Sequence, residues 1–116
     1  MTQLTEKKCL PCEGGVPALG RAECEALMAQ LDPGWKLAPD AKRLDRAFTF
    51  KDFFRTMSFV NAVAHVANVE DHHPDLEVGY DYCRVRWNTH AIGGLSENDF
   101  ICAAKVDALV AAFAAP

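Results

Sequence analysis

Apolar and polar residues alternate in four short stretches of the chain and recur with a helical period in three longer ones. A period of two is typical of a strand with one buried face, whereas spacings of three and four are typical of an amphipathic helix. In chain order, the pattern predicts a helix over 21–31, strands over 35–37 and 44–50, a helix over 51–69, strands over 76–80 and 83–87, and a helix from 96. This order favours an α+β domain in which a four-stranded antiparallel sheet has three helices packed on one face.

The helix over 51–69 has the strongest pattern. Its apolar stripe, which should face the core, consists of Phe53, Phe54, Met57, Val60, Val63, Ala64 and Ala67. The helix runs directly toward Pro74, and proline disfavours a helical conformation in the residue before it. We therefore expect the helix to end by His73.

Residues 1–18 have no such period and contain two prolines and two glycines. We expect an irregular lead-in over 1–18, followed by a single domain over 19–116. The lead-in carries Cys9-Leu10-Pro11-Cys12, but a structural zinc site requires a second pair of ligands. We therefore interpret this pair as incidental.

The composition excludes several classes of function. The net charge of -4 argues against a nucleic-acid or anionic-membrane surface. No stretch reaches the length of about eighteen apolar residues that a transmembrane helix needs, and Met1–Lys8 lacks the apolar core of a secretory signal. Without a signal, the five cysteines are expected to be reduced thiols, which predicts a cytoplasmic protein.

The adjacent histidines His72 and His73, followed by Pro74, are the leading candidates for chemistry. Neighbouring residues do not share a face of a helix or strand, so both rings can reach one site only where the backbone turns. Glu70 and Asp71 place carboxylates next to them. Since histidine exchanges protons near neutral pH, this grouping predicts a proton-transfer site.

A second set of polar residues follows the last strand. Asn88, Thr89 and His90 come first, and Ser96 and Asp99 then open the final helix in a Ser-x-x-acid pattern. That pattern is typical of a helix N-terminal capping box. Asp99 could therefore cap the helix, orient a catalytic histidine such as His90, or do both.

These motifs together resemble the pterin-4a-carbinolamine dehydratase family over residues 19–110. The matching positions are His72-His73-Pro74, Tyr80, Thr89-His90 and Asp99, with Trp35 and the stretch 50–53 as further similarities. The resemblance implies dehydration of 4a-hydroxytetrahydrobiopterin to quinonoid dihydropterin, with pterin as substrate, no cofactor and no metal. It implies catalytic roles for His72, His73, His90 and Asp99. It implies substrate binding by Asp71, His72, His73, Pro74, Asn88, Thr89, His90 and Trp35.

One position departs from the family pattern. Asn68 stands four residues before His72, where the family usually has a charged residue. Glu70 or Asp71 could supply that charge from a different face of the helix end.

The resemblance also implies partners. The family recycles the pterin of aromatic amino-acid hydroxylases, which suggests a functional link to phenylalanine hydroxylase. Its subunits pair through edge strands, so we expect a homodimer or homotetramer. The strand of Cys83, Val85 and Trp87 is a candidate for the pairing edge, and a central position is the alternative.

Two other classes of function remain open. A zinc-binding domain would use the histidines with a cysteine, but adjacent histidines are poorly spaced as ligands. A protein-binding or transcriptional co-regulator module on the same fold is the second alternative. If binding were the sole role of the protein, the presence of all three histidines would have no explanation.

Overall fold

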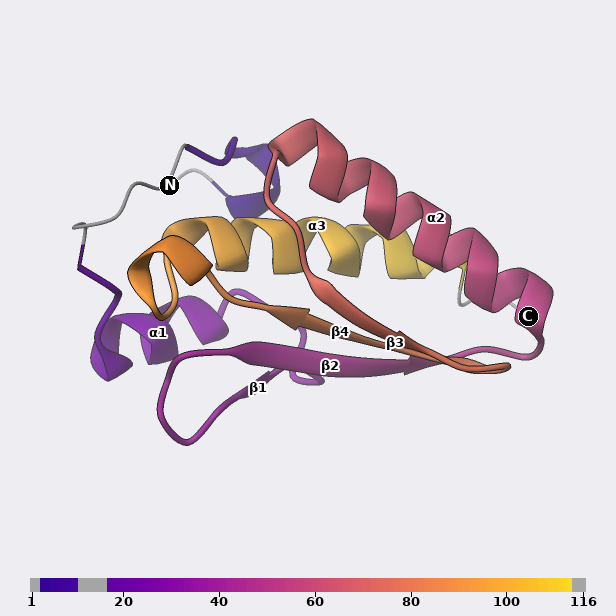
Figure 1. Ribbon diagram of the computed structural model, residues 1–116, viewed down its shortest axis with the longest axis horizontal. Coiled ribbons are helices and arrows are strands. Elements are labelled where there is room, and N and C mark those ends of the chain that lie inside the picture. The colour runs from indigo at the N-terminus through magenta and orange to yellow at the C-terminus, as the bar shows by residue number, and fades with distance from the viewer. Residues whose placement is uncertain (1–2, 11–16, 114–116) are drawn as a thin grey trace.

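The computed structural model describes residues 3–10 and 17–113 (Figure 1). The elements in chain order are η1 (Leu4–Glu6), α1 (Arg21–Met28), β1 (Lys36–Leu37), β2 (Leu44–Thr49), α2 (Phe53–Glu70), β3 (Asp75–Val78), β4 (Tyr82–Trp87), η2 (His90–Ile92) and α3 (Glu97–Phe113). The predicted α+β fold and the predicted order of helices and strands are confirmed. None of the described helices is long and apolar enough to cross a bilayer.

The four strands form one antiparallel sheet in the order β1-β2-β4-β3, and the helices lie over one of its faces (Figure 1). Strands β3 and β4 form a hairpin in which Val78 pairs with Cys83 and Asp75 with Arg86. Because β4 also pairs with β2 along its whole length, it is a central strand. The interpretation of residues 83–87 as the pairing edge is therefore wrong, and β1 and β3 are the edges.

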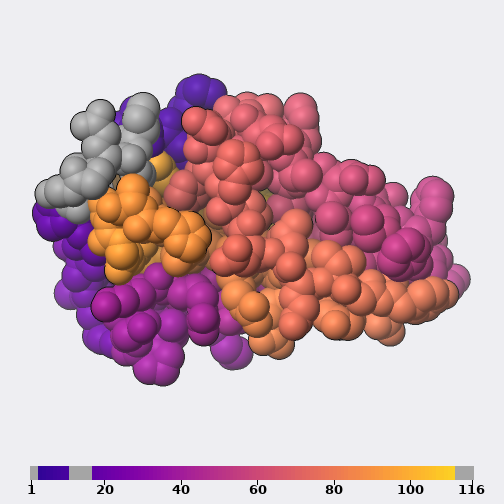
Figure 2. Space-filling model, in the orientation of Figure 1, coloured from indigo at the N-terminus to yellow at the C-terminus, as the bar shows by residue number. Residues whose placement is uncertain are grey.

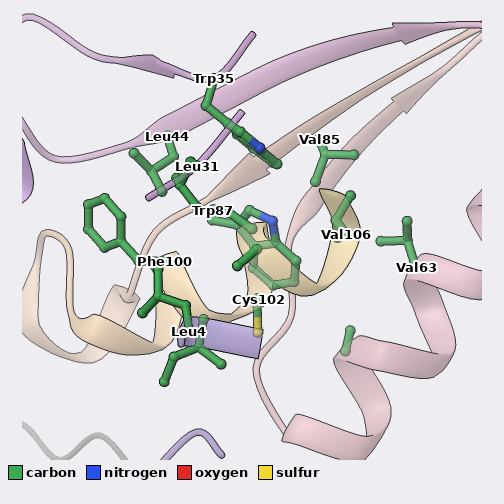
Figure 3. Packing of buried hydrophobic residues seen from close by; sticks show 14 of the residues in the cluster. Leu4, Leu31, Trp35, Leu44, Val63, Val85, Trp87, Phe100, Cys102 and Val106 are labelled. Atoms are coloured by element: carbon green, nitrogen blue, oxygen red, sulfur yellow. The ribbon is translucent and has the colours of Figure 1, made fainter. Parts of the chain in front are cut away.

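The core lies between the sheet and the two long helices. Leu44, Val85 and Trp87 project from the sheet toward Val63 on α2 and Phe100 on α3 (Figure 3). All five side chains are fully buried. Burial of each such side chain is worth about 1.5–3 kcal/mol relative to an exposed one, so this layer contributes substantially to the driving force for folding.

The face that helix α2 turns to the core overlaps the predicted stripe only in part, at Val63 and Ala67. Its buried residues are Thr56, Phe59, Val63, Ala67 and Glu70. Phe54, a member of the predicted stripe, is instead 80% exposed, and Phe53 is 49% exposed. The helix carries apolar residues on more than one side, so periodicity alone could not decide which side meets the sheet.

The N-terminal segment packs on the body of the protein, a role that the sequence did not predict. Leu4 in η1 is only 3% exposed and belongs to the core cluster (Figure 3). The Lys7 ammonium lies 2.9 Å from a carboxylate oxygen of Glu97 at the start of α3. The segment therefore brings Cys9 against the body of the protein, whereas Cys12 lies outside the described residues.

Candidate active site

The end of α2 directs the two adjacent histidines into one site. The helix ends at Glu70, and Asp71 takes a left-handed conformation with φ 52° and ψ 42°. Aspartate is one of the few non-glycine residues that tolerate this region. The backbone turn at Asp71 lets His72 and His73 reach the same cleft, as the sequence predicted.

The cleft has a volume of about 620 Å³ and is open to solvent. Figure 2 shows the segment with the paired histidines beside the segment around residue 90 on one face of the molecule. The residues lining the cleft come from the N-terminal segment, the end of α2, the end of β4 and the start of α3. They are Lys8, Cys9, Leu10, Val69, Glu70, Asp71, His72, His73, Asn88, Thr89, His90, Ala91 and Asn98.

Asp99 is a fully buried carboxylate directly behind His72. Its Oδ1 lies 2.6 Å from Nε2 of His72, and its Oδ2 accepts hydrogen bonds from the Thr89 hydroxyl (2.7 Å) and the Ser96 amide (3.0 Å). A carboxylate only accepts, so His72 carries a hydrogen on Nε2. Asp99 therefore caps α3 and orients a histidine, and that histidine is His72 rather than His90.

The ring of His72 is also fixed from its flat side. It stacks on the indole of Trp87, with the ring centroids 5.6 Å apart and the planes 8° from parallel. The Trp87 side chain is fully buried at the end of β4. Since the carboxylate and the indole act on different parts of the ring, they leave His72 little freedom to rotate.

Thr89 supports this arrangement rather than presenting its hydroxyl to the cleft. The hydroxyl donates to Asp99, so it must accept the hydrogen bond that joins it to the Ser96 hydroxyl at 2.8 Å. Thr89 is 3% exposed. Its predicted contribution to the site is therefore best understood as holding Asp99 in place.

His73 and His90 stand in more open surroundings. His73 is exposed, and its Nε2 lies 3.2 Å from the amide oxygen of Asn68. His90 is exposed at the start of η2, and Gly93, with φ 65°, follows the end of this short helix. Asn68 thus supplies a neutral partner to His73 at the position where the family pattern usually has a charge.

Glu70 does not supply the missing charge to His72. One of its carboxylate oxygens accepts from the Cys9 amide at 2.8 Å, and the other lies 2.8 Å from the Lys105 ammonium. Burial alone would raise the pKa of Glu70, but these two donors outweigh it and the pKa is lowered. Glu70 therefore anchors the N-terminal segment to the body of the protein.

Asn98 forms the second anchor of that segment. Its side chain exchanges two hydrogen bonds with the backbone of Leu10, at 3.0 Å and 2.6 Å. Together with the Glu70 bond, these contacts place Lys8, Cys9 and Leu10 along one wall of the cleft. This wall could not be predicted from the sequence, because the segment has no regular period.

Two of the predicted substrate-binding residues do not line the cleft. Pro74 lies just beyond it, at the start of β3, and Trp35 is buried in the core with 3% exposure. The indole nitrogen of Trp35 donates to Asp107 at 2.7 Å, and the same carboxylate oxygen accepts from Arg46. The remaining predicted residues, from Asp71 to His73 and from Asn88 to His90, do line the cleft, and Asp99 lies behind it.

Among residues 3–10 and 17–113, no three His, Cys, Asp or Glu side chains are grouped so that they could hold a metal ion. This observation includes Cys9 but not Cys12, which lies outside those ranges.

Comparison with families of known proteins gives a match over most of the chain. The family model described as pterin 4 alpha carbinolamine dehydratase matches residues 17–109. A Nitrosomonas europaea protein that carries this activity as a provisional name is 62% identical over 106 residues, which cover 91% of this chain and 92% of that protein. A Legionella pneumophila protein with the same provisional name is 52% identical over 109 residues, covering 94% and 96% of the two chains.

Solved structures with a similar fold carry more than one functional description. A Brucella melitensis protein described as a transcriptional coactivator/pterin dehydratase has a TM-score of 0.75 and 32% identity, and the match covers 79% of this chain and 97% of that one. A pterin dehydratase-like protein described as a RuBisCO assembly factor of the alpha-carboxysome has a TM-score of 0.57 and 25% identity, covering 66% and 88%.

Proposed function

This chain belongs to the pterin-4-alpha-carbinolamine dehydratase family, and on that premise we propose that it dehydrates 4a-hydroxytetrahydrobiopterin to quinonoid dihydropterin by histidine acid–base catalysis. The observation that carries the proposal is the hydrogen bond of His72 to buried Asp99, in a cleft that His73 and His90 also line. The cleft is of a size usual for small-molecule sites.

The reaction needs two proton transfers. One group protonates the hydroxyl that leaves C4a, and another accepts the proton from N5. Asp99 holds the His72 ring in one orientation by binding its Nε2, so we assign His72 as the acid, acting through the remaining ring nitrogen, Nδ1. His73 faces a neutral amide, which makes it and His90 the candidates for the base. Each transfer contributes on the order of 10²–10⁴ in rate.

The proposal includes a place in metabolism. The product is an oxidised dihydropterin that a reductase must return to the tetrahydro form, and the substrate is what an aromatic amino-acid hydroxylase such as phenylalanine hydroxylase releases. The described cysteines, Cys9, Cys24, Cys83 and Cys102, are free thiols, which fits the cytoplasm that we propose as its location.

The direct test is a coupled assay in which a hydroxylase generates the 4a-hydroxy intermediate. Protein freed of metal by chelation should accelerate its decay, because the proposed mechanism uses only side-chain proton transfer. Activity that disappears on chelation and returns with zinc would contradict the acid–base mechanism. No acceleration under either condition would contradict the proposed enzyme.

A second candidate function is protein binding, favoured by the descriptions of the two structural relatives as a coactivator and an assembly factor. The exposed apolar residues Phe53, Phe54 and Tyr80 provide a surface for such a role. A variant with all three site histidines replaced separates the two functions, since it should lose dehydration but keep partner binding.

Substitution of Trp35 by phenylalanine tests whether this residue contacts substrate. We expect KM to stay unchanged, because the ring is buried in the core away from the cleft. The free energy of unfolding should fall by about 1–3 kcal/mol through loss of the Asp107 hydrogen bond and of ring volume. A tenfold rise in KM with unchanged stability would instead favour the substrate-binding role that the family resemblance implies.

We also propose that two subunits pair through β3. All four residues of this edge strand are exposed, and Leu76 and Val78 remain 36% and 39% exposed. Unpaired edges with apolar side chains favour association, whereas a lysine on the edge opposes it. Sedimentation of the native protein should therefore give a dimer or larger species, and Val78→Lys should shift it toward the monomer. Ala108→Lys is the control, because it adds the same charge at an exposed position of α3. A native monomer of 12.8 kDa would contradict the proposal.

A further inference from the structure

Two cysteines meet where the N-terminal segment touches α3. The sulfur atoms of Cys9 and Cys102 are 3.6 Å apart, although the residues are separated by 93 positions in the chain. Cys102 is fully buried in the core (Figure 3), whereas Cys9 is half-buried and lines the cleft. One residue of the pair therefore lines the cleft, and the other lies in the core beside it.

The position of Cys9 is fixed by its own backbone and by its neighbour. Its amide donates to Glu70, and the backbone of the next residue, Leu10, donates one hydrogen bond to the Asn98 side chain and accepts another from it. The Cys9 sulfur also lies 3.6 Å from the backbone oxygen of Asn98. The close approach of the two sulfurs therefore rests on several independent contacts.

We propose that Cys9 and Cys102 form an oxidation site on the wall of the cleft, at which a peroxide converts the two thiols to a disulfide. In the first step Cys9 gives up its proton and its sulfur attacks one peroxide oxygen, the O–O bond breaks, and Cys9 becomes a sulfenic acid. The hydroxide that leaves takes up the Cys9 proton and forms the first water. In the second step the Cys102 sulfur attacks the Cys9 sulfur, and the sulfenic hydroxyl leaves with the Cys102 proton as water. Two electrons pass from the thiols to the peroxide, which is reduced to two molecules of water.

The surroundings assign the two roles. Peroxide can reach Cys9 from the cleft, which makes Cys9 the attacking thiol. The hydrogen bond to Cys9, followed by burial, raises the pKa of Cys102, which disfavours a direct attack of Cys102 on peroxide and leaves it to react second, losing its proton to the departing sulfenic hydroxyl. A buried thiol is protected from peroxide but remains available to a neighbouring sulfenic acid.

The disulfide would join the cleft wall covalently to α3. A disulfide sulfur–sulfur bond is about 2.05 Å long, so the two sulfurs must approach by roughly 1.5 Å. A side-chain movement of this size can occur while the backbone of residues 9 and 10 stays in place. The link would then hold residues 7–10 at the cleft independently of those hydrogen bonds.

Cys12 is the competing partner, and trypsin distinguishes the two outcomes. Cleavage after Lys8 and Arg21 leaves Cys9 and Cys12 in one peptide, 9–21, and cleavage after Arg86 and Lys105 leaves Cys102 in another, 87–105. A Cys9–Cys12 disulfide lowers the mass of the first peptide alone. A bond to Cys102 joins the two peptides, and the Cys12→Ser variant assigns that bond to Cys9.

The experiment treats the reduced full-length protein with hydrogen peroxide, blocks remaining thiols, and maps non-reduced tryptic peptides. We expect the 9–21 and 87–105 peptides to be joined in the native protein and in Cys12→Ser, but not in Cys9→Ser or Cys102→Ala. Cys83→Ala is the matched control, because burial raises the pKa of this unrelated core thiol to about 11. A link within 9–21 alone, oxidation of Cys9 beyond sulfenic acid without a link, or no loss of thiols would overturn the proposal.

Thermal unfolding gives a second readout, on Cys12→Ser. Closing a loop of this length restricts the unfolded chain, so the oxidised protein should unfold at a temperature at least about 5 °C higher than the reduced protein. Reduction with dithiothreitol should reverse the shift, and Cys9→Ser should show none. A linked protein with an unchanged or lower unfolding temperature would contradict the proposed anchoring of the cleft wall.

Discussion

Replacement of His72 by alanine is expected to lower kcat by about 10²–10⁴-fold while the protein stays folded. The reason is that His72 is the histidine that a buried carboxylate and a stacked indole hold in one orientation at the cleft. His73→Ala and His90→Ala should also reduce turnover, since both rings line the same cleft. Turnover of the 4a-hydroxy intermediate per folded molecule is the quantity to measure.

The combined variants test whether the three histidines act as a unit. Residues that share one reaction step do not contribute independently, so the triple variant should be little slower than the slowest single variant. His65→Ala provides the control, because His65 is exposed on α2 and does not line the cleft. Small and additive losses across the three positions would show that they do not share a site.

Much of the fold follows from local patterns in the sequence. The alternation over 44–50 placed Leu44 and Phe48 on the buried side of β2, and the structure agrees. The Ser-x-x-acid pattern located the start of α3, because the Asp99 carboxylate does accept from the Ser96 amide. These predictions held because each depends on residues that are close together in the chain.

The errors concern choices that only tertiary contacts decide. The buried face of α2 is set by what the sheet and α3 present to it, so Phe59 is buried while Phe54 is exposed. The edge strand was misplaced because chain order does not determine order in the sheet. The wall formed by residues 8–10 depends on Glu70 and Asn98, whose side-chain bonds span 61 and 88 positions of sequence.

In the candidate site, too, local features could be predicted from the sequence and tertiary contacts could not. The turn before Pro74 predicted that His72 and His73 reach one site, and the family resemblance implied that His90 joins them. All three line the cleft. It did not identify the partner of Asp99, because His72 and Asp99 are 27 positions apart and only the packed fold brings them to 2.6 Å. Nor did it place Trp87 beneath His72, since alternation marks Trp87 only as a buried strand residue.

Substitution of Asp99 by asparagine should separate its two structural roles. The Ser96 amide can only donate, so the new side chain should keep its oxygen toward Ser96 and Thr89 and turn its NH₂ group toward His72. The NH₂ group also donates, which forces Nε2 of His72 to give up its hydrogen. His72 would then have its hydrogen on Nδ1, which is the wrong tautomer for the proposed role.

We therefore expect Asp99→Asn to lower kcat by about 10²–10⁴-fold, with a loss of about 1–3 kcal/mol in the free energy of unfolding. The same change made in the His72→Ala background should cost little further activity, because its effect acts through that ring. Ser96→Ala is the control, since it removes a hydroxyl at the helix start, at a cost of about 0.5–2 kcal/mol, while the carboxylate keeps its bond to His72. If folded Asp99→Asn turned over at the native rate, Asp99 would only cap α3, and its hydrogen bond to His72 would have no catalytic role.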